Sequence, residues 1–239
     1  MVKRLFDVVC AAVALVLTAP LIGLAAVGIK LTDPKGGPVF YRARRVGYLG
    51  REFTMYKLRT MRQDGGDNGG GPGGPGGPGG PGGPRITGAR DARVYPLGKL
   101  LRRSKIDELP QLFNVLRGDM AIVGPRPEDP MIVKEHYSST DLETLGVRPG
   151  LASPGSIYQF TSGDKLLTGK DPEARYVDKL LKTKLALDRV YIRQASLRRD
   201  VAIIGRTIWA IGAIATGKRK FSAPPEMTAA RRLLAEDDR

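Results

Sequence analysis

The sequence predicts an α/β protein that is mostly helical, with a small sheet, a re-entrant membrane helix at its N-terminus and amphipathic helices at the membrane interface. Three observations predict this architecture. An uncharged apolar run fills residues 8–29, two short segments within residues 37–61 resemble strands, and apolar residues recur at helical spacing after residue 96. The 239 residues suffice for one domain with a core and appendages.

The composition restricts the classes of function. The net charge of +15 attracts polyanions such as nucleic acid, anionic lipid headgroups or phosphorylated substrates. Cys10 is the only cysteine and His136 the only histidine, which excludes an intrachain disulfide and disfavours Ser/His/Asp and Cys/His catalysis. A membrane-tethered nucleic-acid-binding protein is an alternative. Because aromatic residues make up only 6% and no nucleic-acid-binding motif is recognisable, we expect no nucleic-acid partner.

The first predicted element is a membrane helix. The uncharged run from Val8 to Ile29 is 22 residues long, enough to cross the hydrocarbon core of a bilayer as a helix. A cleaved signal peptide is an alternative interpretation. The run is long for the apolar part of a signal peptide, however, and it leads directly into sequence with the character of a folded domain.

Two features favour a re-entrant helix over a straight span. Pro20 lies near the middle of the apolar run, where it removes a backbone hydrogen bond and bends the helix. Lys3 and Arg4 precede the run, and Lys30 and Lys35 follow it, so both ends have a cytoplasmic preference. A helix that enters, bends at Pro20 and returns to the same face satisfies both features. A straight span with a short exposed N-terminus remains the alternative.

The next segments predict the small sheet and an insertion. Residues 37–41 indicate a turn followed by a short strand, and residues 51–61 alternate imperfectly between apolar and polar side chains, as in a strand. Residues 63–84 include five consecutive Gly-Gly-Pro triplets. Such a segment has too few apolar side chains to form a hydrophobic core, so we expect a flexible insertion between two structured parts.

Helical patterns dominate the rest of the chain. We expect helices over residues 96–103, 107–117, 172–188 and 197–215, loops at residues 124–127 and 146–155, and a loose polar tail over residues 222–239. Gly118 is a suitable C-terminal stop for the second of these helices. The helix over residues 197–215 is basic and amphipathic and is expected at a membrane interface, with an ordinary core helix as the alternative.

The adjacent carboxylates Asp107 and Glu108 are the strongest candidates for a chemical role. Adjacent helical side chains diverge by about 100°, which suits a divided task in which one carboxylate attacks or binds and the other positions a metal or accepts a proton. A helix start favours ionised carboxylates and attracts phosphate, and Pro110 is tolerated in a first turn. Simple N-terminal capping by Asp107 is the alternative.

Basic residues surround this pair in the sequence. Arg102 and Lys105 precede it, and Arg126 follows between two prolines that stiffen its backbone. Arginine binds phosphate with a planar fork. A carboxylate nucleophile beside arginines, on a chain with a membrane segment, suggests phosphoryl chemistry on a lipid-linked substrate. Two carboxylates with neighbouring phosphates also suit Mg²⁺, so we expect this cofactor at Asp107 and Glu108.

The same region closely resembles the bacterial sugar transferase family, the monotopic phosphoglycosyl transferases. The matching strings are RSKIDELPQLFNVLRGDM at residues 103–120 and VGPRP at residues 123–127. Further matches are KRLFD at 3–7, GPVF at 37–40, Phe53 with YKLRTM at 56–61, RPGL at 148–151, and Leu187, Asp188, Tyr191, Asp200 and Thr207. The resemblance covers nearly the whole chain outside the insertion and the tail.

The resemblance implies a reaction and its residues. Asp107 would attack the β-phosphate of a UDP-sugar, release UMP and hold a covalent phosphosugar, which polyprenyl (undecaprenyl) phosphate then accepts. Glu108 would assist with Mg²⁺ or with the acceptor. The residues expected to bind phosphate or substrate are Arg102, Arg126, Lys57, Arg59 and Arg148. A non-catalytic membrane scaffold in a glycan assembly complex is the alternative function, and UMP release would distinguish the two.

The resemblance also implies an organisation of the chain. Residues 1–31 would form the re-entrant membrane helix, residues 32–221 a catalytic domain on the cytoplasmic face of the inner membrane, and residues 222–239 the tail. Membrane lipids are expected partners, and a homodimer is possible. The family commonly has serine directly before the proline, where this chain has Ala19, and residues 150–159 also depart from the family pattern.

Overall fold

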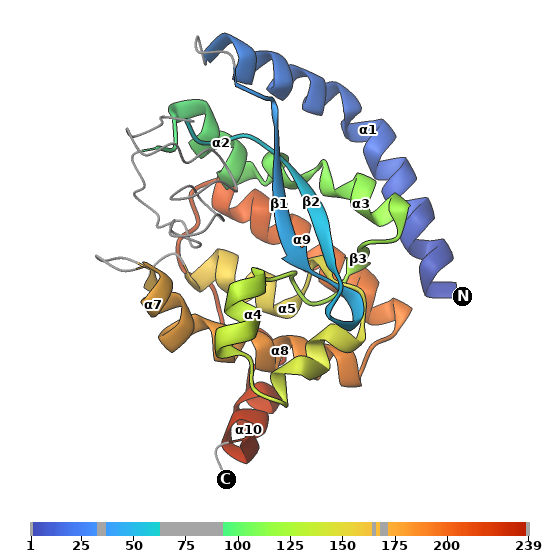
Figure 1. Cartoon of the computed structure of the whole chain (residues 1–239), viewed down its shortest axis with the longest axis vertical. Helices are drawn as coiled ribbons and strands as arrows, with labels where there is room; N and C mark the ends of the chain where they lie inside the picture. Colours follow the sequence, from blue (N-terminus) through green and yellow to red (C-terminus); the bar gives the residue numbers. More distant parts are fainter. Residues whose placement is uncertain (1, 33–36, 63–92, 164–165, 168–171, 238–239) are drawn as a thin grey trace.

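A computed structural model describes residues 2–32, 37–62, 93–163, 166–167 and 172–237, and it is mostly helical (Figure 1). The predicted insertion over residues 63–84 lies outside the described residues. In chain order the helices and strands are α1 (Val2–Thr32), β1 (Phe40–Val46), β2 (Glu52–Leu58), α2 (Pro96–Ser104), α3 (Gln111–Arg117), β3 (Ala121–Val123), α4 (Pro130–His136), β4 (Gly150–Ala152), α5 (Pro154–Tyr158), α7 (Pro172–Tyr176), α8 (Lys182–Arg193), α9 (Leu197–Ala215) and α10 (Met227–Asp237). Short helical turns lie between them and include η2 (Ile106–Glu108), η4 (Gln159–Gly163) and η5 (Val177–Leu181).

The expected small sheet is present as two separate two-stranded pairs. β1 and β2 form an antiparallel hairpin in which Phe40 pairs with Leu58 and Val46 with Glu52. β3 and β4 pair in parallel, with Ala121 opposite Gly150. The expectation of a loop over residues 146–155 is therefore wrong for β4 and for the start of α5.

Glycines allow the second pair to form. The backbones of Gly124 and Gly150 approach so closely that a Cβ on Gly150 would lie 2.1 Å from the Gly124 nitrogen. A side chain at this position would force the two segments apart. The close approach fixes the segment after β3, which carries Arg126, against the segment that leads into α5.

α1 is one continuous 31-residue helix that includes Pro20. Of the helices that the structure describes, it alone is long and apolar enough to cross a membrane, and most of its apolar window is exposed. A core helix of a soluble protein would be mostly buried, whereas this helix exposes apolar side chains that the other described residues do not cover. The large exposed residues on it are Val2, Leu5, Val9, Val13, Val16, Leu17, Leu21, Leu24, Val27 and Leu31.

Polar contacts hold the N-terminal turns of α1 on the domain. The Lys3 ammonium donates to buried Asp200 of α9 at 2.6 Å, and the Asp200 carboxylate also accepts from the Tyr191 hydroxyl at 2.7 Å. Arg4 donates to the carbonyls that end α3, and buried Asp7 accepts from the backbone N–H of β3 residue Ile122. Three charged side chains in the first turns of α1 thus bond to three distant parts of the chain, α9, the end of α3 and β3.

The C-terminal half of α1 packs on the domain through apolar contacts. Ala25 and Ile29 form a buried cluster with Leu58 at the end of β2 and with Tyr95 and Leu101 around α2. Both ends of α1 therefore lie against the same folded domain, which Figure 1 shows as a long helix along one flank of the molecule.

The later helices agree with the sequence in part. The predicted helix 172–188 continues through α7, the π-helical turn η5 and α8 as far as Arg193. α9 has the predicted bounds. Its first turn is capped by the Ser196 hydroxyl, which accepts from the Arg199 N–H, and Arg103 of α2 donates to the terminal carbonyls of Ile214 and Ala215.

The expectation of a loose tail over residues 222–239 is wrong for residues 227–237, and residues 238–239 lie outside the described residues. Residues 227–237 form α10, whose Met227, Ala230 and Leu233 are buried against Ala186, Leu187 and Val190 of α8. Glu226 before this helix accepts a bidentate pair of hydrogen bonds from Arg206 of α9, at 2.6 and 2.9 Å. The side chains of α10 that contact α8 are three small or apolar residues at helical spacing. Their partners on α8 are remote in the sequence, so the sequence pattern alone does not indicate this contact.

We expect Asp200→Ala to lower stability by about 1–3 kcal/mol, because the Tyr191 hydroxyl loses its buried acceptor and the Lys3 ammonium its partner. Thermal unfolding of the detergent-purified protein measures this. Arg44→Ala is the control, because the Arg44–Glu52 pair is solvent-exposed and contributes about 1 kcal/mol or less. Equal losses in the two variants would contradict the anchoring role of Asp200.

Candidate active site

The candidate site lies where η2, the end of β2 and the loop after β3 meet. The predicted helix over residues 107–117 begins only at Gln111, and Asp107 and Glu108 belong to the 3-10 turn η2 before it. Pro110 explains why the α-helix starts later than expected, since proline has no N–H to bond the Ile106 carbonyl in an α-helical pattern. Leu109 donates to that carbonyl instead, at 3.2 Å, which tightens the turn.

Glu108 is fixed by a bidentate ion pair. Its Oε1 accepts from Arg126 Nη2 at 2.7 Å and its Oε2 from Arg126 Nη1 at 3.1 Å. The Lys105 and Lys57 ammonium groups lie 3.2 and 3.6 Å from Oε1. Burial alone would raise the pKa of Glu108, but the charges of Arg126, Lys105 and Lys57 outweigh it and hold that pKa well below its usual range. Glu108 is therefore an anion at neutral pH and a poor proton acceptor.

Asp107 has the opposite environment. Its side chain is buried, and Oδ1 has no hydrogen-bond partner among the described residues. Burial, followed by the negative charge of Glu108, raises the pKa of Asp107, whereas Lys57, Lys105 and Arg102 oppose the shift. Two adjacent carboxylates thus have pKa values pushed apart, which is the usual sign of a division of roles.

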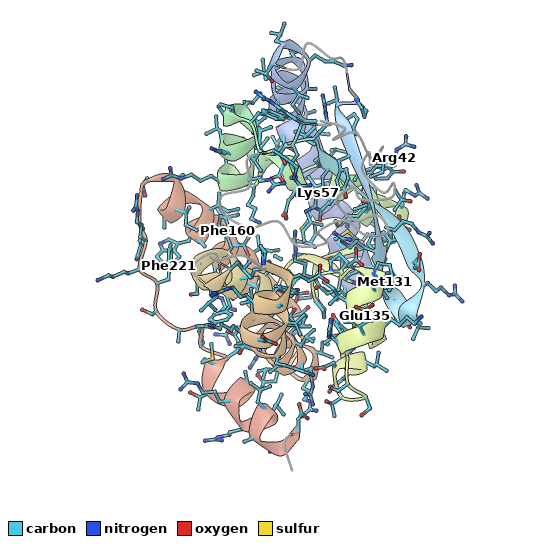
Figure 2. The ribbon with its side chains drawn as sticks, turned by 60° about the vertical axis from the view of Figure 1, so that its left-hand side comes forward. Arg42, Lys57, Met131, Glu135, Phe160 and Phe221 are labelled. Atoms are coloured by element: carbon cyan, nitrogen blue, oxygen red, sulfur yellow. The ribbon has the colours of Figure 1, made fainter. Side chains whose placement is uncertain are left out.

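Lys57 stands at the end of β2 beside both carboxylates. Burial lowers the pKa of Lys57 to about 8, although the nearby Glu108 charge favours the ammonium form. The group is thus a cation at neutral pH that can lose its proton under mildly alkaline conditions. Figure 2 shows Lys57 extending from the β2 strand.

The structure does not bring all the predicted basic residues to this point. Arg102 donates to the Thr60 hydroxyl at 2.8 Å and contributes to the field at Asp107. Arg59 is buried, and its guanidinium donates to the Gly37 carbonyl. Arg148 donates to the Gly118 carbonyl and lies over the Tyr48 ring. Gly118 follows α3 while Asp107 precedes it, so Arg148 is at the far end of that helix.

A cavity of about 220 Å³ opens beside Glu108 and Arg126. One side of it is charged, and the remainder is mainly apolar and comes from β4, α5, η4 and α9. The lining residues are Lys105, Glu108, Leu109, Arg126, Leu151, Ala152, Ser156, Ile157, Gln159, Phe160, Thr207, Ala210 and Ile211. The Lys105 ammonium lies 4.6 Å from the Phe160 ring centre, and Figure 2 shows where Phe160 lies. Such a cavity suits a ligand with an anionic group and a larger, less polar part.

Several residues around the cavity have no clear signal in the sequence. The sequence indicates Lys105 only as a neighbour of the carboxylates, and it does not indicate the walls from η4 and α9. Thr207 has one signal, since it belongs to the family-like positions near the C-terminus. Gln159 and Phe160 have no such signal, because only the fold brings η4 to the cavity.

A buried polar network holds the Arg126 loop in place. Lys184 of α8, fully buried, donates to Glu128 Oε1 at 2.9 Å, and the Tyr176 hydroxyl donates to Glu128 Oε2 at 2.7 Å. Asp188, one helical turn after Lys184, accepts from the Gly155 N–H at 2.8 Å, and burial raises the pKa of Asp188 to about 6. Glu128 is two residues from Arg126, so α8 positions the guanidinium that binds Glu108.

A divalent cation fits this site in part. Among the described residues, no group of three or more His, Cys, Asp or Glu side chains could hold a metal by itself. The unpaired Asp107 oxygen is a suitable ligand, whereas both Glu108 oxygens already accept from Arg126. Mg²⁺ is typically held by one or two carboxylates together with phosphate oxygens of the substrate. The residues therefore fit a cation that is bound jointly by Asp107 and a phosphorylated ligand.

Taken together, the site has a buried carboxylate, a fixed ion pair and two lysines, and a cavity with apolar walls opens beside the ion pair. These groups can attack an electrophilic phosphorus and stabilise the negative charge on its oxygens.

Comparison with known proteins places this arrangement in a family. The family described as bacterial sugar transferase matches residues 1–213. A UDP-glucose:undecaprenyl-phosphate glucose-1-phosphate transferase of Caulobacter vibrioides is 38% identical over 211 residues, covering 86% of this chain and 68% of that protein. The exopolysaccharide production protein ExoY of Rhizobium meliloti is 37% identical over 214 residues, covering 88% of this chain and 85% of that protein.

A relative with a different sugar in its name is similar over the same region. The UDP-N-acetylgalactosamine-undecaprenyl-phosphate N-acetylgalactosaminephosphotransferase of Aeromonas hydrophila is 34% identical over 209 residues, covering 87% of this chain and 43% of that protein. The family match extends over the membrane helix, the carboxylate pair and the cavity walls alike. The chain belongs to the bacterial sugar transferase family.

Proposed function

We propose that this protein transfers a sugar 1-phosphate from a UDP-sugar to polyprenyl (undecaprenyl) phosphate, with release of UMP, as the first membrane step of a polysaccharide or glycoconjugate pathway. The observation that carries the proposal is the buried, unpaired carboxylate of Asp107 beside a Glu108 that is held by Arg126. The names of the relatives support an undecaprenyl phosphate acceptor and a role in exopolysaccharide production.

The first half-reaction forms a covalent intermediate. An oxygen of the Asp107 carboxylate attacks the β-phosphorus of the UDP-sugar, and a new O–P bond forms. The bond between that phosphorus and the bridging oxygen breaks, and UMP leaves with its electron pair. A buried carboxylate oxygen without hydrogen bonds keeps its lone pairs available for this attack.

The second half-reaction releases the product. A phosphate oxygen of the polyprenyl phosphate attacks the same phosphorus, the acyl phosphate bond breaks, and Asp107 recovers its carboxylate. The product is a polyprenyl diphosphate-sugar. No external proton acceptor is needed when the attacking phosphate oxygen is already ionised, which is consistent with a Glu108 whose low pKa makes it a poor base.

The cations of the site would stabilise the transferred group. Lys57 and Lys105 lie beside the carboxylates and can contact phosphate oxygens, and Glu108 positions the Arg126 guanidinium. Arg102 adds positive charge near Asp107. Mg²⁺, when bound with the diphosphate, would neutralise charge on its oxygens, and Asp107 is the carboxylate with an oxygen free to hold it.

Contacts at the two ends of α1 support the membrane arrangement that we propose. Lys3 and Ile29, near opposite ends of this helix, both contact the same folded domain. We infer that both ends lie on the cytoplasmic face of the inner membrane and that the helix is re-entrant at Pro20 within lipid, with its exposed apolar face against acyl chains. α9, with exposed Ile208 and Trp209, would lie at the interface. Dimer formation stays a prediction of the sequence.

Asp107→Asn is expected to reduce UMP release to background, because an amide lacks the nucleophilic charge of the carboxylate. The assay uses protein in nanodiscs with Mg²⁺, undecaprenyl phosphate and a panel of UDP-sugars, and thermal unfolding verifies that the variant is folded. Without acceptor, the wild-type protein should gain the mass of one sugar phosphate. UMP release that survives the substitution would show that another group is the nucleophile, and no release from the wild type with any donor would favour the scaffold alternative.

The pH dependence of kcat/KM for the donor should fall on the alkaline side with an apparent pKa near 8. Lys57 loses its charge as the pH rises through about 8, and its neutral amine no longer attracts phosphate oxygens. In Lys57→Arg the guanidinium stays charged, so the fall between pH 8 and 10 should disappear even if the overall rate is lower. A wild-type profile that stays flat to pH 10 would contradict the role of Lys57.

Single cysteines would report the topology of α1. In a Cys10→Ala background, Val2→Cys and Leu31→Cys place exposed thiols near the two ends. A membrane-impermeant maleimide should label both in inverted inner-membrane vesicles and neither in spheroplasts, because both ends face the cytoplasm. Leu17→Cys, in the middle of the helix, is the control and should react only after detergent is added. Labelling of the two ends from opposite sides would mean a straight span.

A further inference from the structure

Gln111, the first residue of α3, has an environment that the reaction described above does not explain. Its side chain is 0% exposed, and neither its amide nitrogen nor its amide oxygen has a hydrogen-bond partner among the described residues. A buried primary amide without partners destabilises a folded protein, because it has given up water and gained nothing in return. The side chain is thus equipped for a partner that is absent from the free protein.

Gln111 follows Asp107 by four residues along helical backbone. Leu109 has φ −55° and ψ −35°, and Pro110 has φ −59° and ψ −17°, so the chain stays helical from η2 into α3. Residues about one turn apart on a helical segment are near neighbours. Asp107 Oδ1 and the two amide atoms of Gln111 are the buried side-chain atoms without a hydrogen-bond partner among the described residues of η2 and α3.

The neighbouring strand defines what else surrounds this amide. One turn further along α3, Asn114 donates to the Thr54 carbonyl at 2.7 Å and accepts from the Tyr56 N–H at 3.1 Å, so that its amide is bonded to β2. At the other end of the contact, Lys57 of the same strand lies beside Glu108. In the sequence Gln111 lies three residues after Glu108 and three before Asn114, and both η2 and α3 contact β2.

We propose that the Gln111 amide is a catalytic residue that donates a hydrogen bond to a non-bridging oxygen of the phosphoryl group while that group is bonded to Asp107. This rests on the proposed function, since it needs the transferred phosphorus at Asp107. The amide forms and breaks no covalent bond. When the O–P bond to Asp107 forms and UMP leaves, the negative charge on the phosphoryl oxygens meets an N–H that was already buried and oriented. A donor fixed in advance needs no reorganisation at the moment of transfer.

Gln111→Met tests the proposal because a structural role and a catalytic role predict different outcomes. Methionine has a similar shape and no polar atoms, so the free protein loses a buried unpaired amide and its melting temperature should stay the same or rise. The single-turnover rate of UMP release at saturating UDP-sugar, without acceptor, should fall by about 10- to 100-fold, the effect of one hydrogen bond to a charged group. A merely structural residue would not combine higher stability with a slower reaction.

Controls separate this proposal from the function on which it rests. Asn114→Leu removes an amide that is fully bonded, and it should lower the melting temperature, which shows that the measurement detects lost hydrogen bonds at this helix. If Gln111→Met reacts at the wild-type rate while Asp107→Asn is inactive, the role of Gln111 is overturned and the proposed function stands. A fall in melting temperature together with activity would also overturn it. If the wild type releases no UMP from any donor, both fail.

Discussion

The bidentate ion pair between Glu108 and Arg126 is the contact on which the arrangement of the site depends. It joins the turn before α3 to the loop after β3, two segments that make no regular secondary structure with each other. Arg126 is itself held, because Glu128 two residues later is fixed by Lys184 and Tyr176. A charge pair this well bonded tolerates burial, whereas removal of either partner would leave an unpaired charge. The pair directs two of the guanidinium N–H groups to Glu108, whereas Asp107 Oδ1 has no hydrogen-bond partner among the described residues.

The same elements connect the site to the apolar helix α1. On β2, Leu58 packs against Ala25 and Ile29 of α1, while its neighbour Lys57 extends to the opposite face of the strand, toward Glu108. A strand that has an apolar side chain on α1 and a cation in the site fixes the distance between them. The position of a lipid-linked phosphate relative to the carboxylates would then be set by side-chain packing and not by a flexible linker.

The sequence could predict the elements whose signals are local. The bounds of α9, a short strand near residue 40 and a second strand within residues 51–61 follow from periodicity and turn signals, and motif resemblance identifies Asp107, Glu108 and Arg126 as candidate site residues. Three features could not be predicted that way. The chemistry of Pro110 turns the expected helix start into a 3-10 turn, α10 needs a partner surface on α8, and Arg59 and Arg148 bond to backbone carbonyls that are remote in the sequence. A motif identifies which basic residues belong together in a family, but only the fold decides which of them face the carboxylates.

Buried side-chain atoms without a hydrogen-bond partner are concentrated at two residues of η2 and α3. Among the described residues, three of the six such atoms are Asp107 Oδ1 and the two amide atoms of Gln111, and a fourth, Gln159 Oε1, belongs to a residue that lines the cavity. In contrast, Glu128 and Asn114, which support the site, have well-formed hydrogen bonds, although Asp188 Oδ2 has no partner. Each buried unpaired group costs stability. The free protein therefore bears a cost at Asp107 and Gln111 that hydrogen bonds to a phosphorylated ligand would relieve.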